Sequence, residues 1–102
     1  MVFKIVIKPI LWLDLEEAIS WYEKERKGLG KRFFENFEEA IERIKINPNS
    51  YSKVIPDVKR ILVRKFPYKV FYTILNDTVF IIGLSHAKRS NAQVRKRLKL
   101  LK

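Results

Sequence analysis

The side chains with the most evident chemistry in this sequence are basic residues of its second half, accompanied by the only histidine. The set comprises Arg60, Arg64, Lys65, Lys69, His86, Lys88, Arg89 and Arg95. Clustered Lys and Arg bind a phosphate backbone and stabilise the charge of a phosphate under attack. Histidine titrates near neutral pH and commonly transfers protons. The set fits either cleavage of RNA or simple binding of a nucleic acid or an acidic protein.

The distribution of charge favours the same kinds of partner. Residues 1–57 hold ten Lys/Arg and ten Asp/Glu, whereas residues 58–102 hold twelve Lys/Arg and the single acid Asp77. The whole net charge of +11 therefore belongs to the second range. A positive field concentrated in this way attracts polyanions or acidic proteins. The alternative is a solubilising surface that has no specific partner.

The composition excludes several classes of enzyme. The chain has no cysteine and three glycines. Disulfides, thiolate metal sites and a cysteine nucleophile are therefore excluded, and a Gly-rich phosphate loop or a dinucleotide fingerprint is absent. We expect no cofactor and no metal. The apolar runs are far shorter than the roughly 20 residues of a membrane span, so we expect a cytoplasmic protein with no membrane partner.

A chain of 102 residues fits a single domain, residues 1–102. The helices and strands that position the basic side chains can be predicted from hydrophobic periodicity and turn signals. Asp14 and Glu17 resemble a helix capping box, and Asn76-Asp77 a tight hairpin turn. We predict a strand over residues 3–8, helices over 15–27 and 31–46, a loop over 49–57, strands over 59–66, 68–75 and 79–85, and a short basic amphipathic helix over 91–102.

This order predicts an α+β fold, in which a helical hairpin packs on one face of a mostly antiparallel sheet. Side chains alternate along a strand, so we expect Arg60 and Arg64 to share a face that Lys69 can join. Aromatic residues outside this basic face are expected in the core, and Tyr68 and Tyr72 are expected to be sheet or core residues. The other aromatic residues assigned to the core are Trp12, Trp21, Phe33, Phe34 and Phe37.

Two segments carry more specific patterns. Phe66-Pro67-Tyr68 begins a strand that continues to Tyr72, and His86-Ala87-Lys88-Arg89 follows the last strand. Asp14-Leu15, Trp21-Tyr22, Gly28-Leu29-Gly30, Phe33 and Asn47-Pro48 belong to the same pattern. Taken together over about residues 3–95, these motifs resemble the RelE/ParE superfamily of bacterial and archaeal toxins from type II toxin–antitoxin pairs. The known fold of that superfamily agrees with the element order predicted above.

The resemblance implies one of two activities, of which the first is catalytic. The RelE-like branch cleaves mRNA in the ribosomal A site without a metal. In that branch, Lys69 falls where a strand arginine stands, Arg89 falls on the last-strand arginine, and Arg60 falls on one of two strand lysines. Leu62 takes the place of the other lysine. Arg95 takes the place of the catalytic tyrosine in the C-terminal helix. The residues assigned to catalysis are then Arg89, Lys69, His86 and Arg60. Those assigned to contacts with RNA or a partner are Arg64, Lys65, Lys88 and Arg95.

The second activity involves no chemistry. The ParE-like branch lacks the nuclease residues and inhibits DNA gyrase, and the Phe-Pro-Tyr and His-x-x-Arg patterns are common in that branch. A basic RNA-binding module without catalysis is a third alternative. For a toxin of either branch, the resemblance implies a cognate acidic antitoxin that folds onto the basic face. The partner of the released toxin would be the ribosome and its mRNA, or gyrase.

Overall fold

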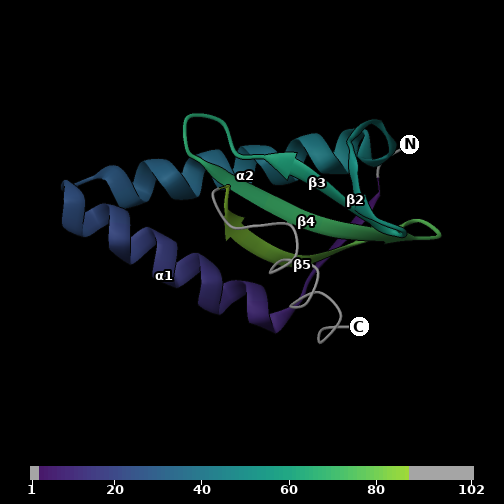
Figure 1. The fold of residues 1–102 in the computed structure, drawn as a ribbon, viewed down its shortest axis with the longest axis horizontal. Helices are drawn as coiled ribbons and strands as arrows, with labels where there is room; N and C mark the ends of the chain where they lie inside the picture. Colours follow the sequence, from purple (N-terminus) through teal and green to yellow (C-terminus); the bar gives the residue numbers. More distant parts are fainter. Residues whose placement is uncertain (1–2, 88–102) are drawn as a thin grey trace.

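The chain folds as a helical hairpin packed against a twisted sheet (Figure 1). A computed structural model describes residues 3–87. Its elements are β1 (Lys4–Ile7), α1 (Pro9–Glu25), α2 (Leu29–Ile46), the short 3-10 helix η1 (Pro48–Ser50), β2 (Lys53–Ile55), β3 (Val58–Leu62), β4 (Tyr68–Leu75) and β5 (Thr78–His86). The predicted α+β fold is confirmed. The predicted helix over residues 91–102 lies outside the described residues.

The five strands form one sheet in the order β1-β5-β4-β3-β2. β1 runs parallel to β5, and the other neighbouring pairs are antiparallel. The loop predicted over residues 49–57 is wrong, because this range contains η1 and the edge strand β2. Asp57 has a positive φ of 71° and lies in the turn to β3, and Val54 and Ile55 pack beside Val58. A three-residue edge strand gives too short a pattern to recognise in the sequence.

The first helix begins six residues before the position predicted from the capping box. Pro9 occupies the first turn of α1, where its fixed φ suits a helix and its missing N–H costs no hydrogen bond. Leu11 and Leu15 are buried one turn apart on the face toward the core. Asp14 therefore lies inside the helix, and no side chain caps its N-terminus.

The two helices approach closely at their connection. Gly28 has a φ of 88°, and a Cβ on Gly30 would lie 2.7 Å from the backbone oxygen of Ile19. The Glu23 carboxylate accepts hydrogen bonds from the N–H groups of Gly28 and Gly30, at 3.0 and 3.1 Å. An acid at the N-terminus of α2 also complements the helix dipole. Together, the small residues and the carboxylate fix the predicted antiparallel hairpin.

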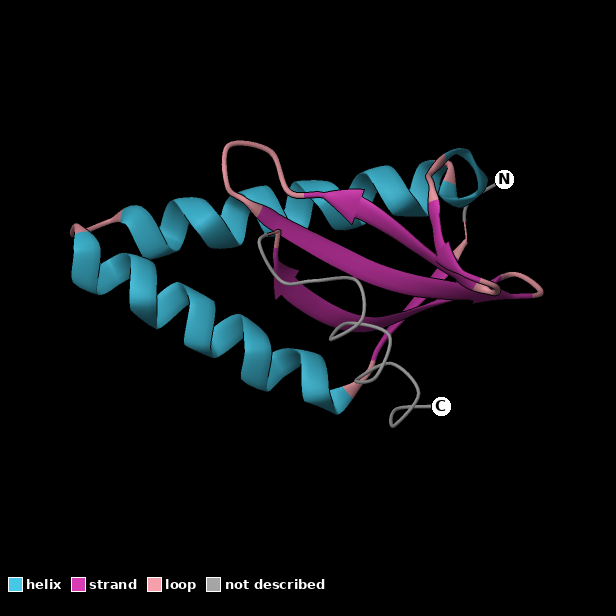
Figure 2. Cartoon of the chain, in the orientation of Figure 1, coloured by secondary structure: helices cyan, strands magenta, loops and turns pink. Residues whose placement is uncertain are grey.

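The main core lies between the hairpin and the sheet (Figure 2). Phe33 packs against the rings of Tyr22, Phe66 and Tyr68, with ring centroids 5.0–5.2 Å apart. Tyr72 is fully buried and donates a 2.6 Å hydrogen bond to the backbone oxygen of Pro48.

Not all the aromatic residues assigned to the core lie in it. Phe33 and Phe37 are buried and Phe34 is partly buried, as predicted. Trp12 and Trp21 are 46% and 56% exposed, so their assignment to the core is wrong. Both lie on α1, where the stripe of Leu11, Leu15, Ala18 and Tyr22 already fills the contact with the sheet.

Candidate functional site

The sheet face that points away from the helices carries the basic side chains of Arg60 on β3 and Lys69 on β4, together with Lys4 of β1 at its other side. In the register of β3 and β4, Arg60 pairs with Phe71 and Leu62 pairs with Lys69. Alternate residues of a strand share a face, so both cations lie on the face of the small apolar cluster formed by Val58, Phe71 and Ile82. We call Arg60, Leu62 and Lys69 the open-face site.

The open-face site has the character of a contact surface. Arg60 and Lys69 are half-buried, and within residues 3–87 neither side chain has an ion-pair or hydrogen-bond partner. Leu62 is 51% exposed beside them. The two cations stand at diagonal positions of neighbouring strands, and the exposed leucine neighbours both of them. Such a surface can bind phosphate oxygens or carboxylates and cover apolar surface at the same time.

Arg64 does not share this face, contrary to the prediction. Its guanidinium lies 3.4 Å from the carboxylate of Glu39 on α2, which also pairs with Arg43 at 2.9 Å. The alternation fails because β3 ends at Leu62 and the chain turns through a loop in which Lys65 has a φ of 69°. Lys65 is exposed in this loop. Arg64 and Lys65 are thus separate from the open-face site.

His86 lies on the opposite face of the sheet from Arg60 and Lys69. It pairs with Tyr68 across β4 and β5, whereas Lys69 pairs with Ser85. The rings of His86 and Tyr68 lie 5.2 Å apart, and Tyr68 packs on the helix side against Tyr22 and Phe33. The structure therefore does not bring the histidine together with the two strand cations.

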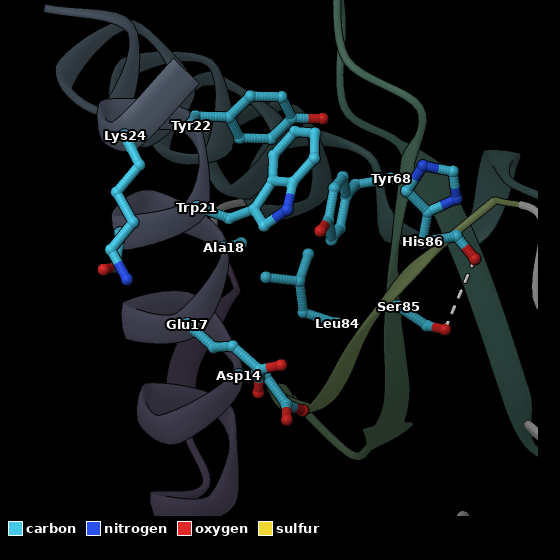
Figure 3. A pocket seen from close by; sticks show the side chains of 11 residues that line it. Asp14, Glu17, Ala18, Trp21, Tyr22, Lys24, Tyr68, Leu84, Ser85 and His86 are labelled. Carbon is cyan, nitrogen blue, oxygen red and sulfur yellow. Dashed lines mark hydrogen bonds between the residues drawn. The ribbon is translucent and has the colours of Figure 1, made fainter. Parts of the chain in front are cut away.

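His86 instead lines a groove of about 430 Å³ between α1 and the end of β5, which we call the α1/β5 groove (Figure 3). Trp21, Tyr22 and Leu84 form apolar walls, and Asp14, Glu17 and Lys24 contribute charge from α1. Burial raises the pKa of Tyr22, and the neighbouring Tyr68 raises it further. The groove is therefore apolar inside, with a mostly acidic side formed by the helix.

Comparison with known proteins places the chain in a family. Residues 6–91 match the model of the family described as "ParE toxin of type II toxin-antitoxin system, parDE". The chain belongs to the ParE toxin family. The family in turn implies an antitoxin partner. No curated protein matches the sequence.

Two solved structures share the fold of this ParE-family chain. One is from the chromosomal ParDE system of P. aeruginosa, with a TM-score of 0.76 and 10% identity over 85% of this chain and 98% of that chain. The other is a mutant of the E. coli toxin RelE in the free state, with a TM-score of 0.72 and 16% identity over 100% of both chains. At these identities the likeness concerns the fold alone, which is common to both branches of the superfamily.

The remaining predicted site residues, Lys88, Arg89 and Arg95, lie outside the described residues. Within residues 3–87, no group of His, Asp and Glu is arranged to hold a metal ion. None of the described helices is long and apolar enough to cross a membrane.

Sequence reasoning missed the α1/β5 groove. Trp21 and Glu17 line it, but the first was assigned to the core and the second to a helix cap. The available signal was the surplus of apolar residues on α1, since Trp12, Leu13 and Trp21 fall outside its buried stripe and remain exposed.

Proposed function

We propose that this ParE-family protein is a toxin that arrests growth by binding its target through the open-face site, without catalysis, and that the target is DNA gyrase. The observation that carries the proposal is the separation of His86 from Arg60 and Lys69 by the sheet. A general acid or base must lie within hydrogen-bond reach of the proton that it transfers. A histidine on the far face cannot act on a phosphate held by the two cations.

The composition of the open-face site agrees with a binding role. It consists of two basic side chains, Arg60 and Lys69, and the exposed Leu62, and it includes no His, Asp or Glu. Fixed cations next to exposed apolar surface are typical of sites that bind acidic macromolecules. An acidic antitoxin that covers the same surface would inhibit such a toxin by occupancy alone.

Cleavage of ribosome-bound mRNA is the second candidate, because Arg60 and Lys69 do stand together on one face. In that mechanism the 2′-hydroxyl attacks the adjacent phosphate, and the two cations, joined by Arg89, stabilise the charge that develops. Proton transfer would then depend on water or on a group beyond residue 87, and not on His86.

The test compares two variants of the full chain in three assays. Expression without an antitoxin should arrest growth, Arg60→Ala combined with Lys69→Ala should relieve the arrest, and His86→Gln should retain it. Purified protein is then added separately to gyrase with relaxed DNA and to translating ribosomes. Our proposal expects loss of supercoiling and intact A-site mRNA. Cut mRNA with normal supercoiling would replace it with the nuclease mechanism.

The pH dependence of any cleavage identifies the proton-transfer group. If His86 took part, His86→Gln would slow cleavage by about 10²- to 10⁴-fold and alter its pH profile. Equal rates and equal profiles in the parent and in His86→Gln would exclude the histidine from the reaction, as the placement of His86 leads us to expect.

A further inference from the structure

The outer side of the helical hairpin is acidic, although the protein as a whole is strongly basic. Residues 9–23 and 33–42 contain no Lys or Arg. The basic residues of α1 and α2 lie instead around the helix connection and in the last turn of α2. The two acidic ranges hold eight of the eleven acids of the chain, namely Asp14, Glu16, Glu17, Glu23, Glu35, Glu38, Glu39 and Glu42.

Four of these glutamates lie on the side of the hairpin that points away from the sheet. Glu16 is exposed on α1, opposite the buried stripe of that helix. On α2, Glu35, Glu38 and Glu42 follow one another along the exposed side at spacings of three and four residues. Within residues 3–87, none of the four has an ion-pair partner. Like charges at this spacing repel one another, so a cationic partner relieves a repulsion that exists in the free protein.

Exposed apolar side chains lie beside these acids. Trp12 and Leu13 of α1 are 46% and 63% exposed, and Leu13 lies about one helical turn from Glu16. We call Trp12, Leu13 and the four glutamates the acidic hairpin face. A partner that fits this face presents fixed cations next to an exposed apolar side chain.

The open-face site of a second copy has this composition. Arg60 and Lys69 have no ion-pair partner within residues 3–87, and Leu62 beside them is 51% exposed. The net charge of +11 makes two copies repel each other at long range. At about 0.15 M salt, however, charges more than about 8 Å apart are largely screened, whereas opposite charges across an interface lie closer than that. Local complementarity can therefore outweigh the net repulsion.

We propose that the acidic hairpin face of one copy binds the open-face site of a second copy. The hairpin glutamates pair with Arg60 and Lys69 of the second copy, and Trp12 and Leu13 cover its Leu62. The helices lie on one side of the sheet and the open face is the other side (Figure 1), so the two surfaces of one copy point in opposite directions. Two copies cannot make both contacts at once, and the association is therefore head-to-tail and continues beyond a dimer.

The association regulates access to the open-face site. Each docked hairpin covers the open-face site of its neighbour, so a target can bind there only after the copies separate. This consequence rests on the proposed function, in which the target binds the open-face site. The association itself does not depend on the target, and its test contains neither gyrase nor ribosomes.

Sedimentation velocity of the purified full chain over a concentration series tests the proposal. At about 0.15 M salt, we expect the weight-average mass to rise with concentration beyond that of a dimer, and at about 1 M salt the association should weaken. Glu16→Lys combined with Glu38→Lys should raise the apparent dissociation constant at least about tenfold, because each reversed charge replaces an attraction by a repulsion. A chain that is monomeric at every concentration, or a parent mass that stops at the dimer, would overturn the proposal.

Mixing two variants identifies the two surfaces. The hairpin variant, Glu16→Lys with Glu38→Lys, keeps an intact open face, and Arg60→Glu with Lys69→Glu keeps an intact hairpin. Neither variant should associate with itself, since each has lost one of the two complementary surfaces. An equimolar mixture should form a dimer through the two intact surfaces and should stop there, because both ends of that dimer are blocked. A mixture that stays monomeric while the parent associates would assign the association to another surface.

A single charge reversal elsewhere on the hairpin provides the matched control. Glu25 is also an exposed helical glutamate, but it ends α1 beside Arg26 and Lys27 and lies outside the acidic hairpin face. Glu25→Lys and Glu38→Lys change the net charge equally. We expect Glu38→Lys to weaken the association about fivefold and Glu25→Lys to leave it nearly unchanged. Equal effects would show that net charge governs the association and that the acidic hairpin face does not.

Discussion

The sheet has a covered face, which packs against the helices, and an open face, which points away from them. The two faces differ in what packs on the central strands β3, β4 and β5. On the helix side, Val70, Tyr72 and Ile81 are covered by the hairpin and are 0% exposed. On the open side, a smaller apolar cluster around Phe71 lies beside Arg60 and Lys69. One face therefore contributes most of the stability, and the other has charged side chains available for a partner.

This division predicts that binding and stability can be changed separately in the protein. Removing apolar surface from the covered face leaves a cavity, which costs more free energy than the loss of the same atoms from a surface. Changing an exposed charge usually alters stability by less than about 0.5 kcal/mol. Substitutions on the covered face should therefore change the free energy of unfolding strongly and binding weakly. Substitutions on the open face should change binding strongly and the free energy of unfolding weakly.

Phe33→Ala should have the largest effect on stability. Its ring is fully buried against Tyr22, Phe66 and Tyr68, so we expect the free energy of unfolding to fall by about 3–5 kcal/mol. Leu62→Ala on the open face, where the side chain is 51% exposed, should cost less than about 1 kcal/mol. Urea denaturation of both variants measures the difference. Comparable losses would mean that the open face is packed as firmly as the covered one.

Gly30→Ala tests how closely α1 and α2 must approach each other for the hairpin to cover the sheet. The new Cβ would lie 2.7 Å from the backbone oxygen of Ile19, and because this neighbour is backbone, the helices must separate. We expect a loss on the order of 2 kcal/mol in the free energy of unfolding. At Gly28, nothing lies within 4 Å of a Cβ and only the positive φ is strained, so Gly28→Ala should cost about 1 kcal/mol. The reverse order in thermal unfolding would contradict this account.

Much of the covered face could be predicted from the sequence, because periodicity reports burial. The apolar positions of α2, from Phe33 to Ile44, identified that helix and its buried side correctly. The start of α1 could not be placed in the same way. Asp14 and Glu17 have the spacing of a capping box, but the apolar stripe that decides the register already begins at Leu11.

The open face was harder to predict because alternation holds only while a strand continues. It correctly put Arg60 and Lys69 on one face, and it failed at Arg64 because β3 had already ended at Leu62. The position of His86 depends on the register of β4 with β5, in which Tyr68 and Lys69 pair with His86 and Ser85. A single sequence gives the residues of each strand but does not fix which of them are paired.

Tyr72→Phe removes one polar contact from the covered face. The hydroxyl donates to the buried backbone oxygen of Pro48, and leaving that oxygen without a donor should cost about 1–2 kcal/mol near neutral pH. Burial, and secondarily the nearby Tyr51, raises the pKa of Tyr72 well above its ordinary value. In the unfolded chain the phenol ionises near pH 10, whereas in the folded chain it stays protonated.

The pH dependence of that variant follows from the raised pKa. The contribution of Tyr72 to stability is complete below about pH 10 and is lost as the pH rises above it, because only the unfolded state then releases the proton. The free energy of unfolding of the parent should therefore fall more steeply above about pH 10 than that of Tyr72→Phe. Denaturation curves measured at about pH 9 and 11 provide the comparison, and parallel losses in the two proteins would rule out this role of Tyr72.

Arg60→Ala combined with Lys69→Ala should have the smallest effect on stability and should separate the two faces most clearly. Neither side chain has a partner within residues 3–87, so the free energy of unfolding should change by less than about 0.5 kcal/mol. Binding to a polyanion such as heparin or single-stranded nucleic acid should weaken. Each lost phosphate contact lowers the slope of log affinity against log salt by about one, so the double variant should lose about two.

The matched control for this variant removes the same charge at another place. Lys27→Ala combined with Lys31→Ala changes two exposed lysines beside the helix connection, far along the chain from the open-face site. A uniform positive field would make the two double variants equivalent, since each lowers the net charge by the same amount. A defined site on the open face predicts instead that only the loss of Arg60 and Lys69 changes the salt slope by about two. Equal slopes in the two double variants would therefore assign polyanion binding to total charge and not to this face.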